Sequence, residues 1–302
     1  MKNFEFKGKK KQDYFEGWYT RILDLDNNIN IAVIFAVTLN SDDPHAFIQV
    51  YDGVALTNTY FRYDIGLFKV VGDKIEIGSN SISPNHLTCI NDSIKLEVTF
   101  SKQVQVQKYL GFQSAMTFLS KFPLQCFQEV IFMDGNFEGK CVIKDQSTDI
   151  KGSLYMEKTF GDRFPKSWIW IQGNQFPIDV NISISFGLIP IMKRTINGFF
   201  AIVQHNQKEY RFGTYNFSKF KILENIDSVL KLKIYNRKYT LYVDLDVQDP
   251  VTLVGPSNDG NMNLEVYESI NSVATIRLFR KKVLLFESSG SYIGAENMYK
   301  KD

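Results

Sequence analysis

Alternating hydrophobic and polar positions run through most of the chain and predict an all-β protein. Residues 94–101 and 239–247 alternate apolar with polar side chains, whereas 29–39 is almost continuously apolar. Because successive strand residues point to opposite faces, the first two segments predict strands with one wet face, and the third predicts a strand buried on both faces. About sixteen to eighteen short strands, with turns every 8–12 residues or so, indicate barrels or sandwiches. No helix longer than about two turns is expected.

The number of expected strands favours two β units over one. The length of 302 residues allows one large β domain or two of about 150 residues, but a single closed barrel rarely needs so many strands. The alternation breaks at 109–127, where 114–122 is expected to form a short helix or a covering loop that Pro123 ends. We therefore predict an N-terminal unit over 1–130 and a C-terminal unit over 131–302, with the seam at about 110–150.

Composition and charge exclude several classes of function. Lys and Arg number 35 against 33 Asp and Glu, and no basic stripe marks a nucleic-acid surface. No apolar run is long enough for a transmembrane helix or a signal peptide. The three cysteines form no CxxC pair, which argues against a disulfide framework and a zinc site. A cytoplasmic location is the expectation.

Motifs for familiar chemistry are absent from the sequence. It has no GxGxxG, P-loop, HExxH or GxSxG, and its three histidines have no partner at ligand spacing. We expect His45 to lie in a solvated loop, and we expect neither a metal nor a cofactor. Acid–base chemistry would then depend on carboxylates, tyrosine or lysine. The candidates nearest to aromatic residues are Glu16, Glu157, Lys158 and Asp162.

The stretch 155–174 holds the densest mixture of aromatic and charged residues. A strand at its end places four side chains on one face, namely Trp168, Trp170, Gln172 and Asn174. Buried indole N–H and carboxamide groups need partners, so this face is a candidate binding surface. Gly161 and Pro165 predict a turn that carries Asp162 and Arg163. The plainer interpretation is structural, since aromatic residues suit a half-buried strand.

Four segments resemble the tocopherol cyclase-like family in order and spacing. Two carry specific motifs, Tyr14-Phe-Glu-Gly-Trp-Tyr19 and Tyr155-Met-Glu-Lys158 with Gly161, Phe164, Pro165, Trp168, Trp170, Gln172 and Asn174. Two are supportive, with Leu253, Pro256, Gly260 and Met262, then Glu268 and Ser269. The resemblance implies two lipocalin-like β-barrel or sandwich units packed together, related to carotenoid hydratase-type folds, and an apolar pocket for a prenylated ring compound.

The sequence departs from the pattern of that family at three positions. Where the family carries an acid, a second acid and a histidine, this chain has Thr159, Gln125 and Gln128. Three side chains able to handle protons are thus replaced by side chains that do not titrate.

The first functional hypothesis is an intramolecular cyclase of the isomerase or lyase type. A neutral carboxyl, Glu157 or Glu16, would protonate a prenyl double bond, and a phenol oxygen would close a chromanol-type ring. Lys158 and Asp162 are the remaining catalytic candidates. Contacts to the ligand are assigned to Trp18, Tyr19, Tyr155, Trp168, Trp170, Gln172 and Asn174. The indoles would face the cation, and Gln172 with Asn174 would bind ring hydroxyls.

The second hypothesis is a lipocalin-type carrier of an isoprenoid or another hydrophobic ligand, such as a prenyl quinol, collected by transient membrane contact. The residues also have a structural interpretation. Glu157 and Lys158 would form a surface ion pair, Glu16 would accept backbone N–H bonds, and Asp162 with Arg163 would tie their turn together.

Overall fold

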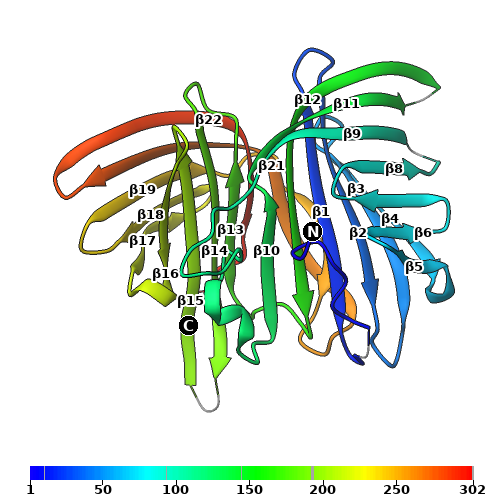
Figure 1. The fold of residues 1–302 in the computed structure, drawn as a ribbon, viewed down its shortest axis with the longest axis horizontal. Helices are drawn as coiled ribbons and strands as arrows, with labels where there is room; N and C mark the ends of the chain where they lie inside the picture. The colour runs from blue at the N-terminus through cyan, green and yellow to red at the C-terminus, as the bar shows by residue number, and fades with distance from the viewer. Residues whose placement is uncertain (10, 93, 144, 192–193, 301–302) are drawn as a thin grey trace. The chain divides into compact units, whose positions relative to one another are not determined.

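The computed structural model describes residues 1–9, 11–92, 94–143, 145–191 and 194–300. It confirms the all-β class, because the described elements are strands and three short 3₁₀ turns, arranged in two antiparallel sheets (Figure 1). The turns are η1 (Ile65–Leu67), η2 (Thr117–Lys121) and η3 (Thr214–Asn216). None of the described helices is long and apolar enough to cross a membrane.

The chain divides into two compact units. Unit 1 comprises Met1–Val106, Gln125–Phe164 and Leu253–Glu265, and unit 2 comprises Gln107–Leu124, Pro165–Thr252 and Val266–Asp302. This differs from the continuous division expected at 130, because β12 (Gln146–Gly161) is 16 residues long and pairs with the first strand of the chain. A later segment, Leu253–Glu265, also belongs to unit 1. Pairing between distant strands leaves no trace in local periodicity.

The sheet of unit 1 runs in the order β4-β3-β2-β1-β12-β11-β9-β8-β7-β6-β5, with β10 paired to β12. Its other strands are β1 (Phe15–Asp24), β2 (Ile29–Thr38), β3 (His45–Asp52), β4 (Thr57–Asp64), β5 (Phe68–Val71), β6 (Lys74–Ile77), β7 (Asn80–Ser83), β8 (His86–Ile90), β9 (Lys95–Val104), β10 (Cys126–Phe132) and β11 (Asp134–Ile143). As predicted, β2 is buried on both faces and β9 alternates buried with exposed residues.

The sheet of unit 1 curls around one core into a nearly closed barrel (Figure 1). Strands from both ends of its order contribute side chains to this core, among them Trp18, Ile48, Ile77 and Phe137. A sheet can bury one side chain from each of so many strands against the others only by closing on itself.

The second sheet, whose strands come mainly from unit 2, runs in the order β16-β15-β14-β13-β22-β21-β19-β18-β17, with β20 paired to β21. Its strands are β13 (Trp168–Gly173), β14 (Val180–Ile191), β15 (Arg194–His205), β16 (Lys208–Gly213), β17 (Lys219–Ile226), β18 (Val229–Tyr235), β19 (Tyr239–Asp246), β20 (Val251–Pro256), β21 (Met262–Arg280) and β22 (Val283–Asn297). The described strands outnumber the expected sixteen to eighteen. Strands of four residues, such as β7, are too short for a clear period.

Candidate functional site

A buried ion pair joins β1 to β12 inside the barrel of unit 1. Trp18 lies directly opposite Lys158 in the strand register, so Glu16, Trp18 and Lys158 share the face that looks into the core. Lys158 Nζ lies 2.7 Å from Glu16 Oε1, and both side chains are fully buried. The Tyr14 hydroxyl donates a hydrogen bond of 2.7 Å to Glu16 Oε2.

The residues around this ion pair change the pKa values of Lys158 and Tyr14 and stabilise the buried ammonium. Burial lowers the pKa of Lys158, and the negative charge of Glu16 opposes that effect. Burial raises the pKa of Tyr14 well above its usual range, and the Glu16 carboxylate raises it further, so Tyr14 stays a neutral donor. The ammonium also lies 5.6 Å from the Trp18 ring centroid and 5.1 Å from that of Phe160. These cation–π contacts add to the stabilisation of the buried charge.

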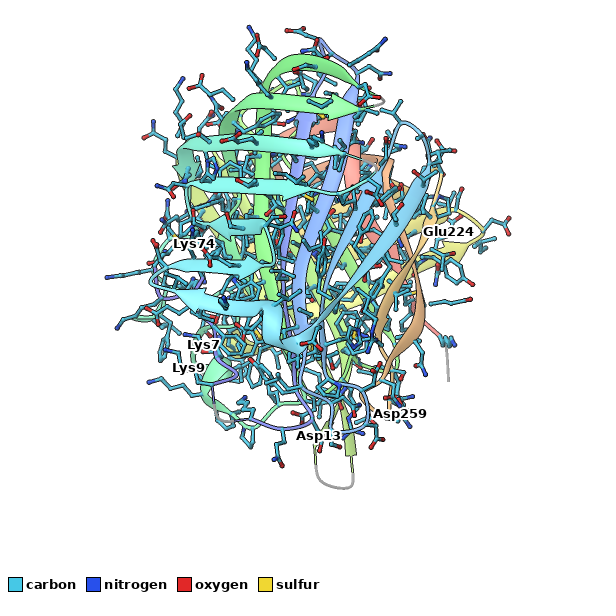
Figure 2. The ribbon with its side chains drawn as sticks, turned by 90° about the vertical axis from the view of Figure 1, so that its right-hand side faces the viewer. Lys7, Lys9, Asp13, Lys74, Glu224 and Asp259 are labelled. Atoms are coloured by element: carbon cyan, nitrogen blue, oxygen red, sulfur yellow. The ribbon has the colours of Figure 1, made fainter. Side chains whose placement is uncertain are left out.

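The N-terminal segment covers this ion pair, and its backbone groups form hydrogen bonds with the side chains of Glu16, Trp18 and Lys158. The Trp18 indole donates to the Phe4 carbonyl at 2.8 Å, and Lys158 Nζ donates to the Glu5 carbonyl at 2.6 Å. Lys7, labelled in Figure 2, donates its backbone N–H to Glu16 Oε2 at 2.7 Å. Glu16 therefore accepts a backbone N–H, as the structural interpretation expected. The three side chains fasten the segment before β1 to the barrel.

A second acid cluster lies on the opposite face of β12. Glu157 Oε2 accepts a hydrogen bond of 2.6 Å from the Tyr155 hydroxyl and one of 2.8 Å from Gln128 Nε2. Tyr19 lies opposite Glu157 in the register, and its ring centroid is 6.5 Å from that of Tyr155. The side chains of the cluster are buried. The expected surface ion pair between Glu157 and Lys158 is wrong, because the two groups are buried on opposite faces and Lys158 pairs with Glu16.

The departures from the pattern of the family fall in different surroundings. Gln128 lies in β10 and contacts Glu157 directly. Gln125 precedes β10, and its side chain donates to the Phe164 carbonyl at 3.2 Å. The substitution at 128 therefore changes a side chain that lies directly against a candidate acid. A carboxamide there can donate a hydrogen bond but cannot pass on a proton at neutral pH.

Asp162 follows β12 at an exposed position, and its negative charge adds slightly to the rise in the pKa of Tyr14 in the Glu16 cluster. Its backbone N–H donates to the Gln125 carbonyl at 2.8 Å. Arg163 donates to the Asn258 carbonyl at 2.8 Å. These contacts connect the turn to neighbouring segments of unit 1.

The exposed setting predicted for His45 is also wrong. His45 is buried at the start of β3, where Nε2 lies 2.6 Å from the Tyr60 hydroxyl and Nδ1 lies 2.9 Å from the Asp43 carbonyl. Burial lowers the pKa of His45. The described residues contain no group of three or more His, Cys, Asp or Glu that could hold a metal ion.

The predicted aromatic face is present on β13 of unit 2. Ile169 and Ile171 point into the core of this unit, which leaves Trp168, Trp170 and Gln172 on the other face of the strand. The Trp168 indole donates to the Glu296 carboxylate of β22. Sequence reasoning missed Glu296, since no local pattern links the last strand of the chain to β13. Asn174 is half-buried just beyond β13, and its Oδ1 accepts from Gln175 at 3.3 Å.

Gln172 is fully buried, yet neither Nε2 nor Oε1 hydrogen-bonds to a described residue. Its register partners are Ser183 of β14 and Gly294 of β22. A Cβ at position 294 would come within 2.5 Å of Gln172 Nε2, so the glycine makes room for the carboxamide. A buried amide with both polar atoms unpaired among the described residues is costly, which marks this position as a candidate contact for a polar group of a ligand.

Comparisons with solved structures show the same fold at low sequence identity. An AttH-type protein from Nitrosomonas europaea aligns with a TM-score of 0.57 and 9% identity, covering 95% of this chain and 93% of its own. Kievitone hydratase from Nectria haematococca gives 0.51 and 14%, covering 94% and 89%. CghA in its structure with Sch210972 gives 0.57 and 11%, covering 95% and 89%.

A comparison with curated proteins finds no match. The family model described as "Tocopherol cyclase-like" matches residues 86–296, which is well over half of the chain. This match confirms the resemblance seen in the sequence motifs. The chain belongs to the tocopherol cyclase-like family.

Proposed function

We propose that this protein binds an apolar prenylated ring compound and closes a chromanol-type ring by protonating a double bond of the prenyl tail. The observation that carries the proposal is the buried carboxyl of Glu157, which Tyr155 and Gln128 hold in one orientation by hydrogen bonds to a single oxygen. Tyr19 and Tyr155 place two aromatic rings beside it. An oriented acid among aromatic rings is what protonation of carbon requires.

The proposed reaction balances without an oxidant or a cofactor. The O–H bond of the Glu157 carboxyl breaks while a C–H bond forms at the less substituted alkene carbon, and a tertiary cation develops at the other carbon. The phenol oxygen of the substrate attacks this cation, and the phenol proton returns to the Glu157 carboxylate. The rings of Tyr19 and Tyr155 stabilise the cation by about 0.5–2 kcal/mol each.

Glu157 fits the role of the acid better than Glu16. Glu16 lies 2.7 Å from the ammonium of Lys158, so its carboxyl group is engaged in a buried ion pair. The N-terminal segment also covers it through Lys7. We therefore assign Glu16, Lys158 and Trp18 to the scaffold of the barrel and assign the chemistry to Glu157.

Within unit 2, Gln172 is a separate candidate contact for a ligand that carries a polar group. Its carboxamide can both donate and accept, and neither atom bonds to a described residue. A ring hydroxyl satisfies such a group well, since it can also donate and accept. The hydratase among the structural relatives adds support, because hydration and ring closure both add the oxygen and the hydrogen of an O–H group across a carbon–carbon double bond without a change in redox state.

A lipocalin-type carrier is the second candidate. Gln128 favours it, since this side chain replaces a proton-handling one of the family and contacts the candidate acid directly. In this reading both units are lipocalin-like and hold the isoprenoid unchanged.

The decisive experiment is incubation of the purified protein with a panel of prenylated hydroquinones, followed by chromatographic separation. Chromatography is needed because ring closure leaves the mass unchanged. The variants are Glu157→Gln and, as a matched control, Glu138→Gln at an exposed position of β11. A cyclised product that Glu157→Gln loses and Glu138→Gln keeps supports the cyclase. Substrate that is retained but unchanged supports the carrier, and failure to bind any compound refutes both.

A further inference from the structure

Two neighbouring segments of unit 2 combine exposed apolar side chains with lysines and contain no acid. The first is the strap, residues 107–124. The second, called the turn, is residues 214–222, which comprise the connection after β16 and the first four residues of β17. They contain four lysines and neither Asp nor Glu. We define the basic–aromatic patch as their exposed apolar and basic side chains: Lys108, Leu110, Lys121, Phe122, Phe217, Lys219 and Lys221.

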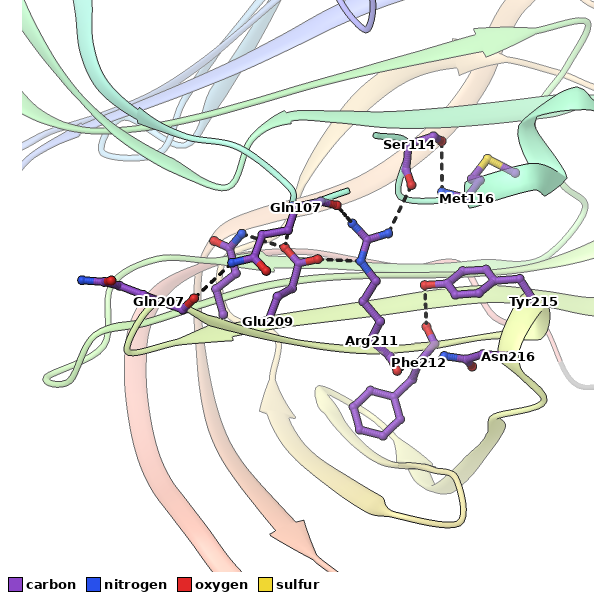
Figure 3. Close-up of polar contacts among 10 residues, drawn as sticks. Gln107, Ser114, Met116, Gln207, Glu209, Arg211, Phe212, Tyr215 and Asn216 are labelled. Atoms are coloured by element: carbon purple, nitrogen blue, oxygen red, sulfur yellow. Dashed lines mark hydrogen bonds and ion pairs between the residues drawn. The ribbon is translucent and has the colours of Figure 1, made fainter. Parts of the chain in front are cut away.

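The strap and the turn are held side by side by buried contacts. Arg211 of β16 pairs with Glu209 at 2.5 Å and donates to the carbonyls of Gln107 and Ser114, as Figure 3 shows. The Glu209 carboxylate also accepts the backbone N–H of Gln107 at 2.9 Å. The ring of Tyr109 in the strap lies 5.8 Å from that of Tyr215 in the turn. The backbone that carries the patch is therefore held in one position by buried contacts.

The apolar residues of the patch contribute little to folding. Phe217 is 92% exposed and Phe122 is 53% exposed, and they are the two exposed phenylalanines among the 25 of the chain, all of which are described. Leu110 is 62% exposed. Phe217 has φ 58° and Leu110 has φ 51°, in the left-handed region that bulky side chains rarely adopt. Large apolar side chains kept exposed on strained backbone point to a role outside folding.

We propose that the basic–aromatic patch docks this protein on a lipid surface that contains anionic headgroups. Phe217, Leu110 and Phe122 insert at the boundary between headgroups and acyl chains, and Lys108, Lys121 and Lys219 contact the headgroups. Apolar side chains that enter the interface beside lysines are the pattern of interfacial membrane binding.

The chemistry of the patch favours a lipid surface over a protein partner. A stable protein interface buries about 800 Å² on each side around a close-packed apolar centre. Here the exposed apolar groups are few and stand on separate turns, which a fluid bilayer accommodates side chain by side chain. Leu223 and Ile226, at the end of β17, are also exposed, but they lie beside the acids Glu224 and Asp227 and not beside unpaired lysines.

The test is co-sedimentation of the full-length protein with vesicles of phosphatidylcholine, with and without phosphatidylserine. We expect binding to the anionic vesicles that weakens as salt is added. Phe217→Asn should lower the partition coefficient about tenfold, since it removes one inserted ring. The double charge reversal Lys108→Glu/Lys121→Glu should lower it by about fivefold or more for each lysine.

Leu56→Asn is the matched control, because Leu56 is also an exposed leucine with positive φ but lies in the β3–β4 turn of unit 1. It should leave vesicle binding unchanged. Phe217→Asn should melt at the same or a higher temperature than the parent, since Asn tolerates the left-handed region better. Melting temperatures therefore separate loss of docking from loss of folding.

Three results would overturn the proposal. One is no binding of the parent protein to either kind of vesicle at low salt. Another is an equal loss of binding in Leu56→Asn and Phe217→Asn. The third is a dimer in analytical ultracentrifugation that Phe217→Asn dissociates, because a second copy would then cover the patch. Vesicle binding is read without substrate, so the outcome is independent of the proposed ring closure.

Discussion

Glu157 and Lys158 are adjacent in the chain, yet their side chains belong to two different clusters on opposite faces of β12. Lys158 lies 2.7 Å from Glu16 inside the barrel, whereas Glu157 accepts a hydrogen bond of 2.6 Å from Tyr155 on the other face. Because successive strand residues point to opposite sides, one dipeptide supplies both a cation that fastens the N-terminal segment and an oriented acid. Glu16 and Glu157 therefore differ in their partners, because Glu16 contacts a cation and Glu157 contacts neutral hydrogen-bond donors.

Replacement of Lys158 by Met should destabilise the protein strongly. It leaves the Glu16 carboxylate buried without its cation, which costs about 3–5 kcal/mol. Urea denaturation measures the change. The double variant Glu16→Gln/Lys158→Met removes both charges and should recover more than half of the loss. If Lys158→Met is as stable as the parent protein, the ion pair does not hold the barrel.

Gln172→Leu should separate ligand recognition from folding. Removal of an amide that has no hydrogen-bond partner among the described residues should leave the melting temperature unchanged or raise it. Affinity for a prenylated hydroquinone should fall about fivefold to tenfold through loss of one hydrogen bond. Affinity for the matching prenylated benzene, which lacks hydroxyls, should not fall. A less stable variant with unchanged affinity for both compounds would assign Gln172 to the scaffold.

Asp24 should make the stability of unit 1 depend on acid pH. Burial raises the pKa of this carboxyl, but hydrogen bonds from Asn27, Lys151 and Asp26 outweigh burial and lower it overall. The contribution of a group with a lowered folded pKa is present above its unfolded pKa, about 4, and is lost as pH falls through the folded pKa.

The variant Asp24→Asn should therefore be less stable than the parent protein by about 1 kcal/mol at neutral pH. The gap should narrow below a pH of about 4. Denaturant midpoints at neutral pH and at a pH of about 3 test this. A gap that stays constant over the range would show that the charge of Asp24 is not what matters.

Arg211→Met should release the strap from the sheet of unit 2. The guanidinium donates to two strap carbonyls and neutralises Glu209, so its loss frees residues 107–124 and leaves a buried carboxylate. Limited digestion with trypsin should cut at Lys108 and Lys121 faster than in the parent protein, and stability should fall by about 3–5 kcal/mol. Arg237→Met, at an exposed turn of the same unit, is the control. Equal cleavage in both variants would contradict the anchoring.

Much of the fold follows from local patterns in the sequence. The two-sided burial of β2 and the one-sided burial of β9 match the apolar run and the alternation at those positions. The expected short helix or covering loop near Ser114 corresponds to the strap with its 3₁₀ turn η2. The composition of the units could not be read this way, because Leu253–Glu265 joins unit 1 through contacts with residues far away in the chain.

The sequence predicted which residues belong to the candidate site, but it did not predict which of them contact one another. The motifs indicated Glu16, Lys158 and Glu157 together, but no spacing rule showed that Glu16 would pair with Lys158 inside the barrel. The contact between Gln128 and Glu157 likewise depends on β10 lying against β12. His45 looked like a loop residue, yet β3 begins at it and buries it.

Which side chains share a face of each strand follows from the order of residues alone, because that alternation is a property of the extended backbone and needs no partner. Membership of the family follows from it as well. Which face meets a core, which acid meets a cation, and which amide is buried without a described partner depend on the folded arrangement. Those outcomes depend on which strands pair and in what register, and pairing is settled by contacts across the whole fold.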